Sequence, residues 1–177
     1  GKTSFFNYIT HSHYKAVNYP GSTVQYHIAT TKQVRPIKWI DTPGIITFSP
    51  HADDEEITFK ALTNLTLLDS KAPQYPHLIL YVADALQLER HLMGFRFIQS
   101  KGYPVVLVIT RADILKKKHG KLTISKLREY VKCPVYFGNT NSGKGMPSIE
   151  NICEALNPNV YTPNIIETES SWKDASI

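Results

Sequence analysis

The first three residues of the chain, Gly1, Lys2 and Thr3, match the end of the phosphate-binding loop G-x-x-x-x-G-K-[ST]. In such a loop the lysine ammonium group contacts the β and γ phosphates, and the threonine hydroxyl group binds Mg²⁺. The helix that begins there points its N–H groups at the anion, and we assign Ser4 to the same site. An ordinary helix start can carry the same residues. A complete loop begins five residues before Gly1, so we expect upstream residues that include a central first strand.

A second candidate for phosphate chemistry is the sequence DTPG at positions 41–44, which follows an apolar stretch. Asp41 can hold Mg²⁺ through a water molecule. Gly44 can offer its N–H group to a γ-phosphate, because no side chain stands in the way. A tight turn built on Pro43 would explain the same residues.

A third candidate is the segment NYPGSTV at positions 18–24, in the predicted loop between the first helix and the next strand. Thr23 can close over a nucleotide there, and its hydroxyl group would reach Mg²⁺ only when a third phosphate is present. A Pro-Gly turn followed by a strand is the simpler local explanation.

The sequence TRAD at positions 110–113, after the most apolar stretch of the chain, is the candidate for base recognition. The Asp113 carboxylate can accept hydrogen bonds from the N1 and N2 groups of guanine, and adenine offers no such pair of donors. Alternatively, Asp113 simply begins the next helix. Thr110 and Arg111 belong to the same loop, and Thr140 with Asn141 could add contacts to the base.

The elements that must position these residues alternate between strands and helices. Two continuous apolar runs, at 77–83 and 104–110, are typical of strands covered on both faces of a parallel sheet. Between them, apolar residues recur at helical spacing over 88–101, and Gly102 ends that helix. Further strands are predicted at 37–40 and 134–137, an edge strand at 26–31, and helices at 53–69, 121–131 and 147–156.

This order predicts an α/β P-loop fold, a doubly wound and mostly parallel sheet with helices on both faces. Ligands bind in such folds beyond the carboxyl ends of the strands, where the candidate residues would converge. We expect one domain over 1–156 and a polar tail or linker over 157–177.

Composition and charge bear on whether the chain binds lipid or nucleic acid. The chain has 177 residues and a formal net charge of +5, part of which lies in the run KKKHGK at 116–121. We interpret this run as a solvated loop, with a lipid- or nucleic-acid-binding patch as the alternative. No aromatic residues interleave with it, so no nucleic-acid partner is expected.

The cysteines and histidines give no convincing metal site. Neither Cys133 nor Cys153 belongs to a C-x-x-C pair, so we expect no disulfide and no zinc site, and a reducing compartment fits best. His11 and His13, near the end of the predicted first helix, are read as solvated residues. No apolar run approaches the length of a membrane span, so we expect the chain itself to be soluble.

Three stretches resemble the cytosolic G domain of the ferrous iron transporter B family, within the P-loop small GTPase class. Residues 18–24 resemble its N-[WY]-P-G-x-T-V loop. Asp84-Ala85 followed by LERHL at 88–92 resembles its D-A-x-x-L-E-R-N-L stretch. The sequence DEEI at 54–57 resembles the acidic start of its second switch helix. The resemblance covers residues 1–156.

The resemblance implies a GTP-binding and slowly hydrolysing switch domain that is coupled to a membrane part moving Fe²⁺. It implies GTP or GDP and Mg²⁺ as cofactors, with Lys2, Thr23 and Gly44 in catalytic positions and Thr3, Thr23 and Asp41 on the metal. It places the domain at the cytoplasmic face of the cell membrane and allows a homo-oligomer formed through the parent protein. Potassium activation is a family property too, but the asparagine that supports it lies upstream of Gly1.

The chain departs from the family pattern at three places. Thr110 stands where the guanine motif N-x-x-D has its asparagine, and Thr140-Asn141 is a loose counterpart of the last base-binding motif. Ile45 follows Gly44 where classical GTPases have a glutamine that orients water, so unaided hydrolysis should be slow.

Two alternatives remain at this point. A soluble GTPase of the same broad class, acting on the ribosome or on tRNA, would share DTPG and the basic charge, although LERHL argues against it. A nucleotide-binding scaffold without turnover would account for Thr110 and Ile45.

Overall fold

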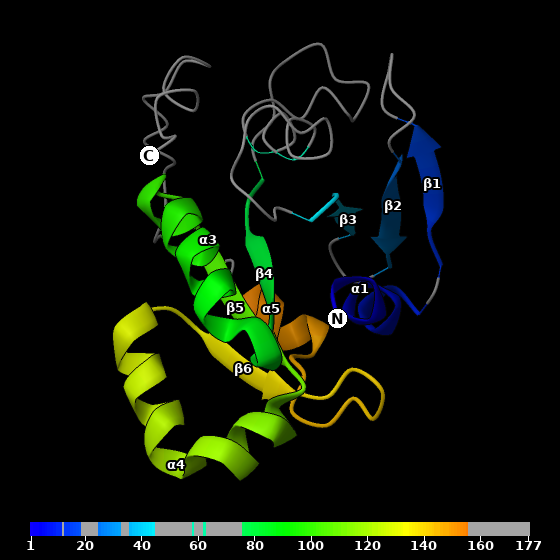
Figure 1. Ribbon diagram of the computed structural model, residues 1–177. Coiled ribbons are helices and arrows are strands. Elements are labelled where there is room, and N and C mark those ends of the chain that lie inside the picture. Colours follow the sequence, from blue (N-terminus) through cyan, green and yellow to red (C-terminus); the bar gives the residue numbers. More distant parts are fainter. Residues whose placement is uncertain are drawn as a thin grey trace. The chain divides into compact units, whose positions relative to one another are not determined.

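The computed structural model describes residues 1–11, 13–18, 25–32, 36–44, 58, 62 and 76–155 (Figure 1). The chain divides into two compact units. We call the first, with residues 1–9 and the described residues from 77 onward, the parallel unit, and the second, with the described residues of 10–76, the antiparallel unit. Each unit has its own three-stranded sheet.

The sheet of the parallel unit has the order β4-β5-β6, with both pairs parallel. Its strands are Ile79–Asp84 (β4), Val105–Thr110 (β5) and Val135–Gly138 (β6). They confirm the strands predicted at 77–83, 104–110 and 134–137, with ends that differ by one or two residues. All six residues of β5 are buried, as a continuous apolar run predicts for a strand covered on both faces.

Helices connect and cover these strands. They are α1 (Lys2–Thr10), the short 3-10 helix η2 (Ala85–Gln87), α3 (Leu88–Ser100), α4 (Ala112–Val131) and α5 (Ile149–Ala155). Figure 1 shows α3 in front of the sheet and α5 behind it. The helices predicted at 88–101 and 147–156 are confirmed. Gly102 follows α3 with a φ of 79°, a conformation that glycine adopts without strain and that ends the helix.

The basic run at 116–121 lies in α4, so its interpretation as a loop is wrong, and the helix predicted at 121–131 begins nine residues earlier. Lysine has a high helix propensity, and a single glycine inside a helix costs only about 1 kcal/mol. Leu115, Leu127 and Val131 lie on the buried side of α4, and this packing outweighs that cost. Lys117 is exposed, in keeping with a solvated basic run.

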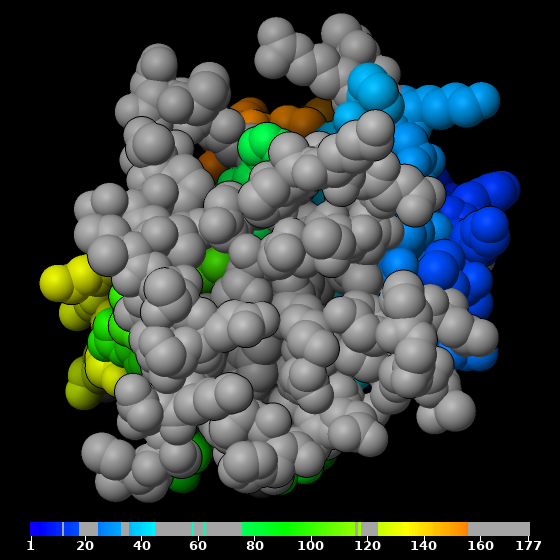
Figure 2. All heavy atoms as spheres, turned by 90° about the horizontal axis from the view of Figure 1, so that it is seen from above, coloured from blue at the N-terminus to red at the C-terminus, as the bar shows by residue number. Residues whose placement is uncertain are grey.

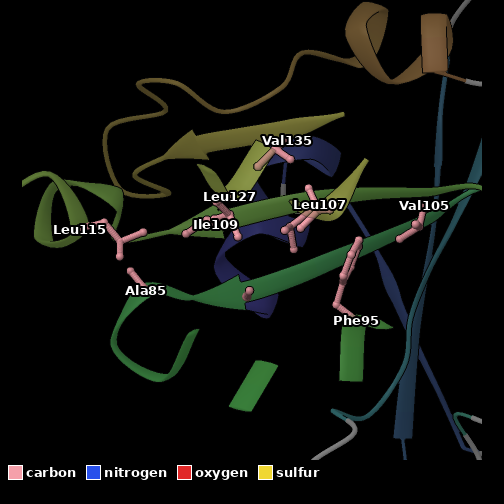
Figure 3. Packing of buried hydrophobic residues seen from close by; sticks show 10 residues of the cluster. Ala85, Phe95, Val105, Leu107, Ile109, Leu115, Leu127 and Val135 are labelled. Atoms are coloured by element: carbon pink, nitrogen blue, oxygen red, sulfur yellow. The ribbon is translucent and has the colours of Figure 1, made fainter. Parts of the chain in front are cut away.

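The core of the parallel unit lies between its sheet and helices α3 and α4 (Figure 3). Phe95 of α3 and Leu115 and Leu127 of α4 pack with Leu107 and Ile109 of β5. Val106 and Val108 point to the opposite face because side chains alternate along a strand, and they are also fully buried. The central strand is therefore fixed from both sides.

Polar contacts join the ends of α3 and α4. Gln99 Nε2 donates to the Val131 carbonyl oxygen at 2.7 Å, and Arg96 Nη2 donates to that of Tyr130 at 3.1 Å. The Arg96 guanidinium group also lies 3.8 Å from the centre of the Tyr130 ring. Figure 2 shows residues of this end of α4, in yellow, against residues of α3, in green.

The antiparallel unit contains β1 (Lys15–Asn18), β2 (Gln25–Thr31) and β3 (Ile37–Asp41) in the order β1-β2-β3. The strand predicted at 37–40 is confirmed. The strand predicted at 26–31 forms but is central in this sheet, so its assignment as an edge was wrong. The reason is β1, whose four residues have no strong strand pattern and are held by pairing with β2.

Several predicted features lie outside the described residues. They include most of the helix at 53–69, of which only Thr58 and Leu62 are described and both are buried. The switch residue Thr23, the acidic segment at 54–57, Ile45 and the tail at 157–177 are also outside. Helix α1 ends at Thr10, so His11 and His13 follow it. Of the helices described, none is both long and apolar enough to span a membrane.

Candidate functional site

The carboxyl ends of the three parallel strands lie in one row. Asp84 pairs with Thr110 across β4 and β5, and Thr110 pairs with Gly138 across β5 and β6. Thr110 is buried, and its Oγ1 donates to the Ala83 carbonyl oxygen at 3.1 Å. A methyl group placed on Gly1 would lie 3.5 Å from the same Oγ1. The predicted phosphate-loop end and the predicted base loop are therefore neighbours within the parallel unit.

The predicted phosphate-binding residues occupy the first turn of α1. Phe5 N donates to the Gly1 carbonyl oxygen at 3.0 Å, so the helix is formed from its first residue onward. Phe5, Phe6 and Ile9 are buried, whereas Thr3 and Ser4 are exposed at the open end of the helix. The first four N–H groups of a helix have no partner within it, and they carry the positive end of its dipole. This end can bind an anion.

The predicted base loop is a sharp turn between β5 and α4. Arg111 has a φ of 56° and takes the N-cap position of α4 without a side-chain cap bond. Asp113 lies in the first turn of α4 and is exposed, so it stands at the beginning of that helix, while Arg111 holds the N-cap position. Arg111 Nε donates to Asp84 Oδ1 at 2.9 Å, and its Nη2 pairs with Asp84 Oδ2. Asp84 Oδ1 also accepts from Leu86 N at 3.0 Å.

The loop with Thr140 and Asn141 leaves β6 at Gly138 and folds back against the strand. Asn139 N donates to the Lys144 carbonyl oxygen at 3.0 Å, and Asn141 N donates to Asn139 Oδ1 at 2.9 Å. Gly145 has a φ of 76°, and a Cβ atom there would lie 2.2 Å from the Phe137 carbonyl oxygen. The close approach of two backbone segments therefore fixes this loop beside the strand end.

The DTPG stretch belongs to the antiparallel unit and is described there by itself. Asp41 ends β3, and its side chain is only 5% exposed. It lies directly opposite His27 of β2, with His27 Nδ1 3.5 Å from Asp41 Oδ2. The Tyr14 ring packs edge-on against the His27 ring, with 4.8 Å between their centres.

Gly44 is exposed, and a Cβ atom placed on it would meet nothing within 4 Å. The Pro43 carbonyl oxygen accepts a hydrogen bond of 2.8 Å from Thr58 Oγ1. The backbone after β3 is thus tied to a buried threonine, and the Gly44 position stays open.

Two side chains beside the predicted site could not be assigned from the sequence. Asp84 directly follows the apolar run at 77–83 in the sequence, but its ion pair with Arg111 depends on the turn that Arg111 makes. The partner of Asp41 is His27, and this pairing depends on the register of β2 with β3. The one sequence signal for either of these contacts was the position of Asp84 at the end of a predicted strand.

Thr3 in the parallel unit and Asp41 in the antiparallel unit each carry an oxygen group, the kind of ligand that Mg²⁺ takes. Across the described ranges, no group of three or more His, Cys, Asp or Glu side chains is placed to hold a metal ion. A site that uses one carboxylate together with substrate phosphates needs no such group.

Comparison with known proteins identifies the family. The family described as ferrous iron transport protein B matches residues 1–153. The Fe(2+) transporter FeoB of Leptospira biflexa is 30% identical over 153 residues, which cover 86% of this chain and 21% of that protein. The chain spans about a fifth of the length of the curated relatives it matches.

Solved structures agree with this match. The cytosolic domain of the T. maritima FeoB iron transporter in a GDP form has a TM-score of 0.75 and 28% identity, over 96% of this chain and 65% of that one. The G domain of the same transporter has a TM-score of 0.67 and 26% identity, over 91% of this chain and 92% of that one. The fold is therefore that of a P-loop GTPase domain, as predicted. The chain belongs to the ferrous iron transport protein B family.

Proposed function

We propose that this chain is a GTP-binding and slowly hydrolysing switch domain of a ferrous iron transport protein. The observation that carries the proposal is the row of Asp84, Thr110 and Gly138 at the strand ends, with Gly1 beside Thr110. This row supports the proposal because the predicted phosphate end and the predicted base end both lie beside it. Family membership and the GDP form of the T. maritima domain support the same reading.

In this proposal Gly1, Lys2, Thr3 and Ser4 hold the phosphates, and Thr3, Thr23 and Asp41 hold Mg²⁺. When bound, Mg²⁺ neutralises charge on the phosphate oxygens. Gly44 offers its N–H group to the γ-phosphate, and its open surroundings suit that role. At the base, Asp113 accepts the two guanine hydrogen bonds. Contacts to the base also come from the loops that contain Thr110, Arg111, Thr140 and Asn141.

The reaction is the attack of water on the γ-phosphorus, in line with the bond to the β-phosphate oxygen, which breaks. The protein contributes mainly by placing the phosphates and by matching their charge, with Lys2 as the fixed cation. Ile45 provides no group that can orient water, so the rate is low. Potassium could raise it if the upstream part of the loop provides a ligand.

The nucleotide state would then pass through Thr23 and Gly44 to a membrane part of the same parent protein. This places the domain at the cytoplasmic face of the cell membrane and leaves room for a homo-oligomer formed through the parent. A role on the ribosome or on tRNA is not favoured, because the family match is to iron transporters.

Phosphate release from GTP in the presence of Mg²⁺ tests the proposal. Replacing both Asp41 and Thr23 by alanine should reduce turnover by at least about a hundredfold, because two ligands of the metal are lost. The matched control replaces Thr30 and Lys38, exposed partners across β2 and β3, by alanine and should keep full turnover. Unchanged turnover in the Asp41/Thr23 variant would refute the catalytic assignment. Binding of GTP without phosphate release by the unaltered protein would favour the scaffold.

A further inference from the structure

Arg111 has an unusual backbone conformation for its residue type. Its φ of 56° and ψ of 36° are left-handed, a region that a residue with a long side chain rarely occupies without support. The turn cannot be relaxed freely, because Thr110 ends the fully buried strand β5 and Ala112, which begins α4, is buried as well. A contact made by the Arg111 side chain can therefore set the direction of the first turn of α4.

That contact is a two-point ion pair with Asp84. Arg111 uses Nε toward Asp84 Oδ1, at 2.9 Å, and Nη2 toward Oδ2, an arrangement that fixes the plane of the guanidinium group as well as its position. The Asp84 carboxylate is itself held by the hydrogen bond from Leu86 N. Its backbone is held in turn by the pairing of Asp84 with Thr110. Contacts other than the one to Arg111 thus hold the Asp84 carboxylate in place.

We propose that Asp84 and Arg111 are positioning residues for guanine recognition. The ion pair holds Arg111 in its left-handed conformation, and this sets the first turn of α4 so that the exposed Asp113 carboxylate faces the base. Neither residue needs to touch the nucleotide for this effect. The inference rests on the proposed function, because it assigns to Asp113 the reading of guanine.

The test compares nucleotides that differ only at the groups Asp113 would read. GDP offers it both N1–H and the N2 amino group, whereas inosine diphosphate (IDP) lacks the amino group. A carboxylate that has turned away loses affinity for GDP more than for IDP, whereas a general loss of folding or phosphate binding affects both equally. The ratio of the two dissociation constants, measured by calorimetric titration, therefore reports the orientation of Asp113.

Two variants remove the ion pair that holds the turn. Arg111→Asn places a residue that can enter the left-handed region but is too short to reach Asp84 and hold the turn there, and Asp84→Asn keeps an oxygen for Leu86 N. Each should lower the preference for GDP over IDP by about fivefold, the upper range for a partly exposed pair. The double variant should be no worse than either single one. The matched control is Lys132→Asn, which also removes an exposed cation from a left-handed position, at the other end of α4, and should leave the ratio unchanged.

Salt dependence gives a second measurement, made on the unaltered protein and on Arg111→Asn. Because the Arg111 side chain is 47% exposed, the ion pair is screened as NaCl rises, so the preference for GDP over IDP should fall in the unaltered protein and stay flat in Arg111→Asn. A preference unchanged in both single variants and across salt would overturn the inference while leaving guanine binding intact. If the unaltered protein binds GDP and ADP equally, the proposed function fails and the inference falls with it.

Discussion

The two units position the residues at the ends of their strands in different ways. In the parallel unit the positions of Asp84, Thr110 and Gly138 follow from backbone register in a sheet whose central strand is buried on both faces. In the antiparallel unit buried and more exposed residues alternate along β3, and the register with β2 sets the buried Asp41 opposite His27. The strand ends thus rest on a core buried on both faces in the first unit and on a less buried ladder with polar contacts in the second. Substitutions should therefore affect the two units by different amounts.

The largest effect should come from the core of the parallel unit. Leu107→Ala removes a fully buried side chain from the middle of β5, which leaves a cavity against Phe95 and its neighbours. We expect a loss of about 2–5 kcal/mol in the free energy of unfolding, measured by urea denaturation. A loss below about 1 kcal/mol would mean that the central strand is not packed as described.

A backbone contact should be nearly as sensitive. Gly145→Ala places a Cβ atom 2.2 Å from the Phe137 carbonyl oxygen and puts alanine at a φ of 76°, so we expect a loss of about 2–4 kcal/mol. Gly44→Ala is the control, because its Cβ atom would meet nothing within 4 Å, and it should unfold at the same urea concentration as the unaltered protein. Equal stability of the two variants would contradict the close approach at Gly145.

The antiparallel unit should respond more weakly to the loss of one polar contact. Trp39 Nε1 donates to Thr31 Oγ1 at 2.8 Å, and Trp39→Phe removes that bond while keeping an aromatic ring. We expect a loss of about 1 kcal/mol, the usual net worth of such a bond. The double variant with Thr31→Val should lose less than the sum of the two single losses. Strict additivity would show that the bond contributes nothing.

The smallest effect is a pH dependence that belongs to the parallel unit. Burial, followed by the charge of Arg90, lowers the pKa of His91 below its usual value of 6.5. The folded state therefore binds this proton less readily than the unfolded chain does. The resulting stability is present above pH 6.5 and is lost as the pH falls below it. His91→Gln should flatten the decline in the free energy of unfolding between pH 7 and pH 5. An unchanged slope would contradict the burial of the imidazole.

Sequence patterns predicted the parallel unit better than the antiparallel one. The continuous apolar run at 104–110 indicates a strand covered on both faces, because it is short and rich in β-branched residues. The four residues of β1 have no such pattern, since they form a strand only by pairing with β2. The run at 116–121 was predicted to be a loop because it is strongly basic. The buried residues that stabilise its helix, Leu115 and Leu127, lie on either side of the run and not within it.

In the candidate site too, some residues could be placed from the sequence and others could not. Thr110 and Asp113 could be placed at a strand end from the sequence, because the strand before them was unmistakable. The Arg111–Asp84 and His27–Asp41 pairs could not, since each depends on a backbone turn or a register that no local pattern encodes. The chemistry of the site therefore stays a prediction from residue types, and only the fold shows which side chains contact Arg111 and Asp41.

The most direct test of the central claim is a titration of the protein with GDP and separately with ADP in the presence of Mg²⁺. A site in which Asp113 accepts both guanine donors should bind GDP at least about a hundredfold more tightly than ADP, because adenine leaves the carboxylate without its partners. Equal affinity for the two nucleotides would contradict the assignment of a guanine site at the end of β5.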